Sequence, residues 1–213
     1  MASRSPAGLF FEVPYMVGQV PTSSVFRALR SKLWLQYGDA DKAIADCRKA
    51  IDLSATAALG YESCGYAFWI TGDFEKSAKF FDSWIRVSRD KTMPLLWSHL
   101  ARARIVKSSG EEMRTISRDL DLRTWPGSAF RLIVGDSNET WVISTANDRN
   151  KTKNDRQVCE ARFFVGQLDL IAGHHEAAVS AMREVARTCA ARDMTHVFAA
   201  AELRRMGETP PVR

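Results

Sequence analysis

A pattern of residues that returns after 34 positions constrains the fold of this chain more than any other feature. Gly72-Asp73 separates two stretches, 58–71 and 74–89, in which apolar residues recur at three- and four-residue steps, as on one face of a helix. Gly38-Asp39 separates two similar stretches. A left-handed glycine can end one helix. An aspartate can then cap the next helix, because its carboxylate accepts hydrogen bonds from the free backbone N–H groups of the first turn. Each copy is therefore predicted to be two antiparallel helices joined by a tight turn.

The two copies agree at further positions, and most of these are apolar. Gly65 lies in the middle of its helix, where glycine costs about 1 kcal/mol relative to alanine. That cost is explained if a neighbouring helix crosses there in close backbone contact, and Ser31 takes the same place in the first copy. The aromatic residues at core positions of the pattern are Trp34, Phe68, Phe81, Trp84 and Trp97.

This pattern resembles the tetratricopeptide repeat (TPR), a helical pair with a small residue near the middle of its first helix and a turn that is often Gly-Asp. The resemblance implies an all-α fold, specifically a TPR α-solenoid of about three to four helical hairpins with a C-terminal capping helix.

On this interpretation the chain has five parts. Residues 1–21 form an N-terminal arm, 22–120 TPR repeats one to three, 121–157 an irregular helical insert ending in a polar, basic loop, 158–207 a fourth TPR-like hairpin plus capping helix, and 208–213 a tail. The third repeat begins at Pro94, and the repeat pattern breaks at Trp125-Pro126-Gly127. In the fourth hairpin, Gly166 is the small mid-helix residue and Gly173-His174-His175 is the turn.

Three stretches resemble one branch of these proteins. CEARFFVGQ and FAAAELRRMG, with Cys189 between them, resemble the C-terminal region of bacterial TPR lipoproteins of the NlpI type. LLWSHLARAR, followed by a Trp-Pro segment, resembles their middle. Members of that family are exported adaptors that hold partner proteins such as cell-wall enzymes, so the resemblance implies a binding scaffold.

The beginning of the sequence bears on the compartment. Its apolar piece AGLFFEVPYMVGQV is interrupted by Glu12 and Pro14, and no clear small-residue cleavage site follows. The sequence as written therefore indicates a cytoplasmic protein, whereas a periplasmic or otherwise exported location follows if the true N-terminus differs. No apolar run reaches the eighteen or so residues of a membrane span, so no transmembrane segment is expected.

The net charge of +5 is mild and is not concentrated in one long run, so we expect no nucleic acid as a partner. An alternative function, a helical nucleic-acid-binding protein, would use the basic loop 149–156, which contains Arg149, Lys151, Lys153 and Arg156.

No pattern in the sequence identifies a catalytic or metal site. His174 and His175 are adjacent, so on a helix they point about 100° apart and would chelate one metal ion poorly. The spacings His-x-x-x-His and Cys-x-x-Cys, a glycine-rich phosphate loop and Gly-x-Ser-x-Gly are all absent. We therefore expect no enzymatic activity, no cofactor and no metal. The alternative is an enzyme whose site is not visible in the sequence.

The partner-binding surface is predicted to be a groove lined by the first helix of each pair, because these helices stack side by side in a solenoid. The residues predicted to line it are Lys32 and Leu35 of repeat one, Leu59, Glu62, Tyr66 and Trp69 of repeat two, and Arg102 and Ile105 of repeat three. This mixture suits an extended or helical peptide better than a phosphate backbone. Tyr66 and Trp69 are expected to be contact anchors, and the alternative is that the N-terminal arm covers them.

The four cysteines lead to two different expectations. Cys47 and Cys64 lie at core positions and are expected to be buried thiols. Cys159 opens the first helix of repeat four and Cys189 closes the second, and these ends lie side by side in an antiparallel pair. They are a candidate disulfide if the protein is exported, and two reduced thiols if it is cytosolic.

Taken together, these features favour a non-enzymatic TPR scaffold or adaptor that binds a partner protein or peptide in the concave groove of its first helices.

Overall fold

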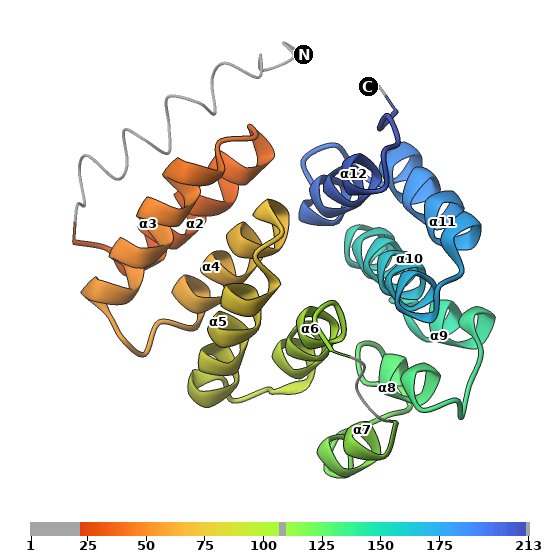
Figure 1. The fold of residues 1–213 in the computed structure, drawn as a ribbon. Coiled ribbons are helices and arrows are strands. Elements are labelled where there is room, and N and C mark those ends of the chain that lie inside the picture. The colour runs from red at the N-terminus through yellow and green to blue at the C-terminus, as the bar shows by residue number, and fades with distance from the viewer. Residues whose placement is uncertain (1–21, 107–109, 212–213) are drawn as a thin grey trace. The chain divides into compact units, whose positions relative to one another are not determined.

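The computed structural model describes residues 22–106 and 110–211, and these residues form eleven helices and no strand (Figure 1). The all-α fold expected from the sequence is therefore confirmed. The predicted N-terminal arm, residues 1–21, and the last two residues of the tail lie outside the described part. The chain divides into two compact units, residues 1–89 and 90–213.

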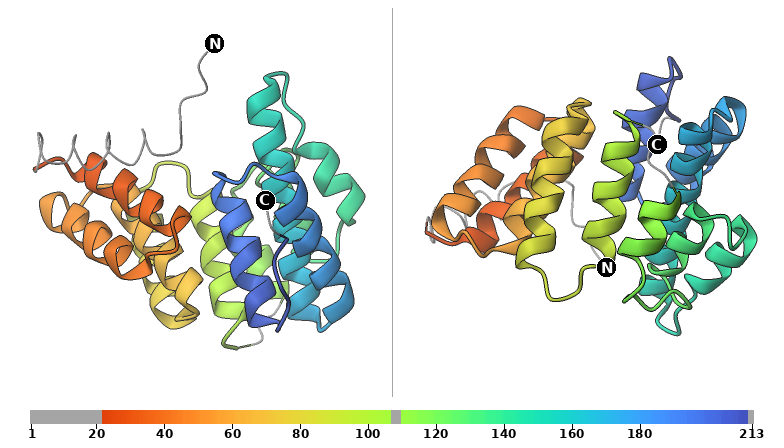
Figure 2. Two further views of the ribbon diagram at one scale, coloured as in Figure 1. Left: turned by 90° about the horizontal axis from the view of Figure 1, so that it is seen from above. Right: turned by 60° about the horizontal axis from the view of Figure 1, so that its bottom comes forward.

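The helices of the first unit follow one another along the chain as two hairpins (Figures 1 and 2). They are α2 (Ser24–Gln36), α3 (Ala40–Leu53), α4 (Ala58–Thr71) and α5 (Phe74–Val87). The second unit contains α6 (Thr92–Ala103), α7 (Gly110–Ile116), α8 (Ser128–Ile133), α9 (Glu139–Thr145), α10 (Lys151–Ala172), α11 (His175–Thr188) and α12 (Met194–Arg205).

The turns of the two hairpins in the first unit have the same structure. Gly38 and Gly72 adopt the left-handed conformation, with φ of 80° and 83°. Asp39 and Asp73 then cap the following helix, since each carboxylate accepts a backbone N–H three residues later at 3.0 Å. The repeat seen in the sequence is therefore also a repeat of local structure.

The capping extends to a lysine and an aromatic ring in each copy. Lys42 and Lys76 donate from Nζ to the capping aspartate of their own turn, at 2.5 and 2.6 Å. The same ammonium groups lie over the rings of Trp34 and Phe68, 4.7 and 5.4 Å from the centroids. Each residue in the first copy lies 34 positions before its counterpart in the second. The same arrangement of capping aspartate, lysine ammonium and aromatic ring is therefore found at the turn of both hairpins.

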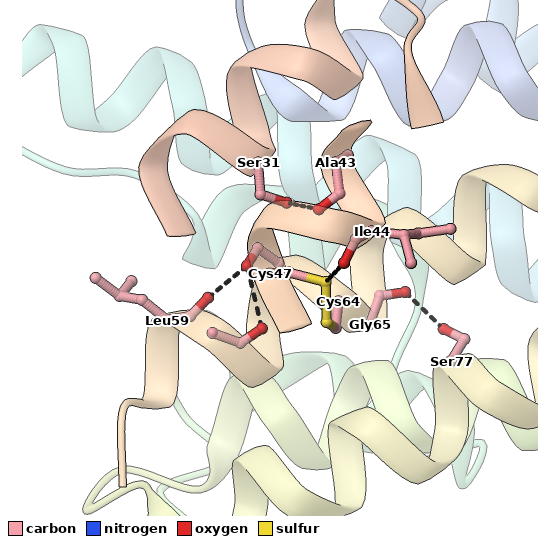
Figure 3. Close-up of a disulfide and its surroundings, with 10 residues drawn as sticks. Ser31, Ala43, Ile44, Cys47, Leu59, Cys64, Gly65 and Ser77 are labelled. Atoms are coloured by element: carbon pink, nitrogen blue, oxygen red, sulfur yellow. Dashed lines mark hydrogen bonds between the residues drawn. A yellow bond between two sulfur atoms is a disulfide. The ribbon is translucent and has the colours of Figure 1, made fainter. Parts of the chain in front are cut away.

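The hairpins pack closely where the small residues lie. Ser31 Oγ donates to the carbonyl of Ala43 at 2.8 Å, and Ser77 Oγ donates to the carbonyl of Gly65 at 2.9 Å, so a buried hydroxyl links the two helices of each hairpin (Figure 3). A Cβ added at Gly65 would overlap the ring of Phe81 on α5. The predicted close approach is therefore present, but an aromatic ring rather than the backbone of a neighbouring helix occupies the space.

Replacing Gly65 with leucine is expected to lower the free energy of unfolding by about 1–3 kcal/mol, despite the better helix propensity of leucine. The ring of Phe81, which a side chain at this position would overlap, is fully buried. Urea unfolding and hydrogen exchange of the α4 and α5 amides would measure the loss. In a double-mutant cycle with Gly65→Ala, Phe81→Leu should cost less than it does alone, because the smaller side chain relieves the overlap. A neutral or stabilising Gly65→Leu would contradict this packing.

The aromatic residues assigned to the core are not all equally buried. Phe68, Phe81 and Trp97 are buried, whereas Trp34 and Trp84 are only half-buried. In the second unit, Trp97 lies 4.9 Å from Phe198 and 5.2 Å from Phe164, measured between ring centroids. Helices α6, α10 and α12 thus share one aromatic core.

One hairpin of the second unit shares two features with the hairpins of the first unit. α10 and α11 are joined at Gly173, whose φ is 85°. Gly166 precedes this turn as Gly65 precedes Gly72, and an added Cβ there would come within 2.8 Å of the Cβ of Ala181. α12 packs on α11 and α10.

The helices predicted to form the third repeat do not pair in this way. α6 packs on α10, and α7 packs on α8. α7 has only seven residues, about two turns, which is too short to cover the length of α6. The predicted break follows at Trp125-Pro126, whose peptide bond is cis.

The predicted basic loop 149–156 is wrong, because most of it is helix. α10 begins at Lys151 and has 22 residues, so Cys159 lies within the helix and does not open it. Asn150 caps this helix by accepting the backbone N–H of Lys153 at 3.0 Å. Lys151 pairs with Asp155 at 2.6 Å, a helix-stabilising spacing of four residues. The many polar residues indicated a loop, but their caps and pairs favour a solvated helix.

Candidate functional site

The predicted groove residues of the first unit meet where α2 packs beside α4. Lys32 Nζ lies 2.6 Å from Glu62 Oε2, and it also lies 5.6 Å from the centre of the Tyr66 ring. The structure therefore brings three of the predicted groove residues together across the two helices.

Three residues of the predicted groove, Tyr66 among them, are buried. Trp69 is 0% exposed, Leu35 2% and Tyr66 7%. Trp69 packs edge-on against Phe74 of α5, with ring centroids 5.1 Å apart. The expectation that Tyr66 and Trp69 are surface contact anchors is therefore corrected, since both belong to the core of the first unit.

The side chain of Tyr66 is held by two aromatic rings of α5. Its ring lies edge-on to Phe81 at 5.8 Å and to Trp84 at 6.3 Å. The sequence pattern placed Tyr66 among the residues lining the predicted groove. Bulky aromatic residues reach beyond their own helix face, so the periodicity of one helix does not show which ring another helix will cover.

The accessible part of this face contains aliphatic and charged side chains. Val25 and Leu29 are 47% and 42% exposed, and with Lys32 they recur at four- and three-residue steps along α2. Leu59, half-buried, lies one turn before Glu62 on α4. We call these five residues the α2–α4 surface.

The two groove residues predicted in the third repeat belong to the second unit. Arg102 Nε donates to Ser98 Oγ of its own helix at 3.4 Å, and Ile105, just after α6, is 45% exposed. Both side chains are accessible, and they belong to the second unit, whereas the α2–α4 surface belongs to the first.

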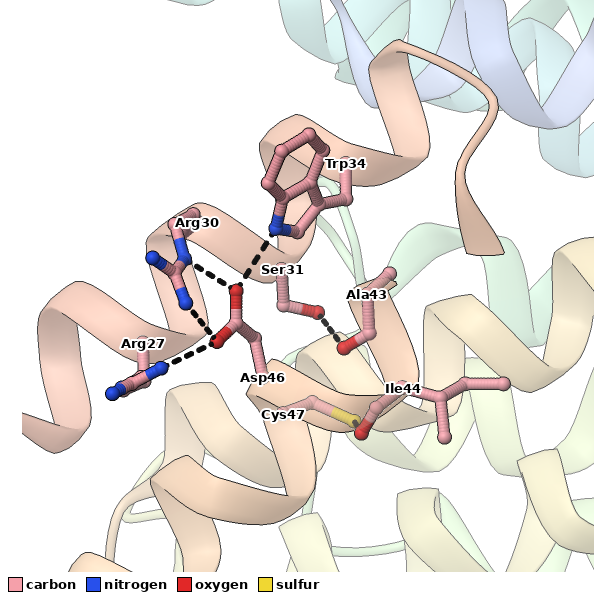
Figure 4. Close-up of polar contacts among 8 residues, drawn as sticks. All are labelled: Arg27, Arg30, Ser31, Trp34, Ala43, Ile44, Asp46 and Cys47. Carbon is pink, nitrogen blue, oxygen red and sulfur yellow. Dashed lines mark hydrogen bonds and ion pairs between the residues drawn. The ribbon is translucent and has the colours of Figure 1, made fainter. Parts of the chain in front are cut away.

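Asp46 is the centre of a polar cluster that the sequence reasoning missed (Figure 4). Its carboxylate accepts two hydrogen bonds from Arg30, at 2.5 and 2.6 Å, one from Arg27 at 3.0 Å and one from Trp34 Nε1 at 3.0 Å. Burial alone would raise the pKa of Asp46, but the hydrogen bonds from Arg30 and Arg27 outweigh it and lower this pKa. The three donors, Arg27, Arg30 and Trp34, recur at three- and four-residue steps along α2. This spacing was the signal in the sequence that could have indicated the cluster.

The cysteines form two disulfides. Cys47 of α3 is joined to Cys64 of α4, with the Cα atoms 5.3 Å apart (Figure 3). The expectation that these two were free thiols is corrected, because the two core positions face each other across neighbouring hairpins. Cys159 of α10 is joined to Cys189, which follows α11, with the Cα atoms 5.8 Å apart. This is the pair that the sequence proposed as a candidate disulfide.

A cavity of about 400 Å³ in the second unit is a further candidate site. Helices α6, α8, α9 and α10 and the turn before α11 line it with six aliphatic side chains and four ionisable ones. These residues are Leu132, Ile133, Val165, Leu168, Ile171, Ala172, His99, Glu139, Asp169 and His174.

The ionisable groups of this cavity influence one another. His174 Nδ1 lies 3.3 Å from Asp169 Oδ1. Partial burial of its carboxyl group and the negative charge of Asp169 raise the pKa of Glu139, although the residue as a whole is exposed, and His174 partly opposes this shift. His99 is buried, and burial lowers its pKa to about 4, so its imidazole is neutral at pH 7. Four separate elements contribute these groups, so no spacing in the sequence marked them as a site.

No known protein-family model matches the chain, and no curated protein is significantly similar to it. Within the described residues, no helix has both the length and the apolar character needed to span a membrane.

Proposed function

We propose that the protein is a non-enzymatic helical-repeat scaffold of the TPR type that binds a peptide of a partner protein across the α2–α4 surface. The observation that carries the proposal is the repeated hairpin, whose turn, cap, cation and ring recur 34 residues apart. Hairpins of this kind place their first helices side by side, and in repeat proteins such faces are the usual binding surfaces.

The side chains of the α2–α4 surface suit a peptide. Val25 and Leu29 offer exposed aliphatic area, and the neighbouring Lys32–Glu62 pair offers one charge of each sign. An amphipathic helix or extended segment with apolar anchors and flanking charges is complementary to such a surface.

Nucleic-acid binding is the second candidate, and the structure weakens the basis for it. The cationic groups at the start of α10 have nearby acids: Lys151 pairs with Asp155, Lys153 with Asp148, and Arg156 with Glu160. Neutralised in this way, the segment offers less charge to a phosphate backbone than its sequence indicates.

The two disulfides support a further part of the proposal, that the protein acts in an oxidising compartment. Disulfides persist outside the cytosol and are rare in it, apart from redox-active and hyperthermophile proteins. The sequence left the compartment open between cytoplasmic and exported, and the disulfides favour the exported alternative.

The binding proposal is tested by the double substitution Val25→Asp and Leu29→Asp. It should weaken partner binding by at least about tenfold, because charge replaces the apolar contacts. Quantitative affinity capture from the native host, followed by titration of the captured partner, would measure the change. Ile116→Asp, at an exposed position of the second unit, is the matched control and should leave binding unchanged. Equal binding by both variants would refute the assignment of the surface.

A further inference from the structure

The cavity between α6, α8, α9 and α10 contains negative charge that the described residues do not neutralise with a fixed cation. Elsewhere in the fold, the buried carboxylates of Asp46 and Glu202 each lie within 4.0 Å of two arginines. In the described part of the chain, neither Glu139 nor Asp169 has a lysine or arginine nitrogen within that distance. The basic group that does lie near Asp169 there is the imidazole of His174.

The groups around these carboxylates do not supply the missing charge. His99 is neutral at pH 7, because burial keeps its pKa at about 4. The remaining walls are aliphatic and come from α8 and α10. Two acids at the edge of an apolar cavity favour a ligand that has a cationic end and an apolar body.

We propose that this cavity binds an amphipathic primary amine, whose ammonium group pairs with Glu139 and Asp169 while its hydrocarbon chain lies against Leu132, Val165 and Leu168. The cavity volume of about 400 Å³ is within the range of small-ligand sites. An ammonium group can donate three hydrogen bonds, which suits two carboxylates on different helices. This site is separate from the α2–α4 surface, so it goes beyond the proposed function and does not depend on it.

Other ligand classes fit the cavity less well. A metal ion needs several ligands at once, and the residues described contain no group of three or more His, Cys, Asp or Glu placed to hold one. An anion would be repelled by the two acids. A neutral alcohol would fill the apolar part but would leave the carboxylates unpaired.

The probe for this site is n-pentylammonium, titrated into the full-length protein and followed by calorimetry and ligand-observed NMR. Binding is expected in the low millimolar range for so small a ligand. 1-Pentanol and pentanoate, with the same chain but no positive charge, should bind at least about tenfold more weakly. The double variant Glu139→Gln, Asp169→Asn should lose affinity by a similar factor.

Two control variants show whether a loss of affinity comes from the lost charge or from a change in folding. Asp155→Asn makes the same change on α10, outside this cavity, and should bind like the wild type. Glu139→Gln alone changes an exposed residue in the first turn of α9, so it should fold normally and still lose at least about threefold in affinity. Circular dichroism would confirm that each variant has wild-type helix content.

The same titration with Nα-acetyl-lysine amide distinguishes two sources of the amine. Comparable binding of both probes would identify a lysine side chain of a peptide as the ligand class, and binding of n-pentylammonium alone would identify a free amine. The proposal is overturned if n-pentylammonium does not bind, if it binds no better than 1-pentanol, or if the Glu139→Gln, Asp169→Asn variant binds it as well as the wild type does.

Discussion

Replacing Asp46 with asparagine is expected to lower the free energy of unfolding of the first unit by about 3 kcal/mol, the lower end of the range for breaking a buried ion pair. Arg27 and Arg30 have side chains only 22% and 19% exposed, so the substitution leaves two poorly hydrated positive charges close together. Asparagine also lacks the second carboxylate oxygen, so the hydrogen bonds from Arg30 and Trp34 cannot all be kept.

The cost of Asp46→Asn should also depend on pH. The arginines lower the pKa of Asp46 in the folded state, so its contribution is complete above its unfolded pKa of about 3.9. The contribution is lost as the pH falls through the lower, folded value, because the wild-type carboxylate then becomes protonated. The difference between wild type and variant should therefore be full at pH 7 and should shrink only below about pH 4.

Urea unfolding at several pH values, with hydrogen exchange of the α2 and α3 amides, would measure both effects. Asp52→Asn, an exposed aspartate on the same helix as Asp46, is the control, with an expected change within about 0.5 kcal/mol. A difference that was absent at neutral pH, or that grew on acidification, would show that Asp46 is not held by these partners.

Removing either disulfide is expected to cost about 3–4 kcal/mol in the chain-entropy account, with the larger loss for the longer loop. The cross-links span 17 residues for Cys47–Cys64 and 30 for Cys159–Cys189. The paired substitutions Cys47→Ala with Cys64→Ala, and Cys159→Ala with Cys189→Ala, compared by urea unfolding, would give the two values.

Thiol counting on protein from the native host provides the matching chemical test. Denatured without reductant, the protein should show no free thiol, since the structure pairs all four cysteines. In native buffer with mild reductant, Cys159–Cys189 should open first, because Cys159 is half-buried while both sulfurs of the other pair are in fully buried residues. Four free thiols in the unreduced protein would refute both cross-links and the oxidising compartment.

Features determined by neighbouring residues could be predicted from the sequence. Gly38-Asp39 and Gly72-Asp73 indicated their turns because a left-handed glycine and a capping aspartate act within a few residues of themselves. The small residue Gly166 indicated a close approach for the same reason as Gly65, and both lie against a neighbouring helix.

Features that depend on distant residues could not be predicted in this way. Trp69 occupied a surface position in the pattern of α4, but its burial depends on side chains beyond its own helix, such as Phe74. Cys47 and Cys64 were correctly placed in the core, yet their pairing depends on how α3 faces α4. Glu139 and His99 were not singled out as a site, because only the packing of separate helices brings them to one cavity.

The two disulfides have a mechanical consequence for a chain that is pulled at its ends. Neither cross-link joins one unit to the other, so the chain is a linear path with two closed loops in series. Tension applied at the ends passes through each cross-link and leaves the residues inside the loop unstretched. The fully extended oxidised chain is therefore about 150 Å shorter than the reduced one, at roughly 3.5 Å per residue. Reduction would thus change the reach of the chain, independently of any effect on its surface.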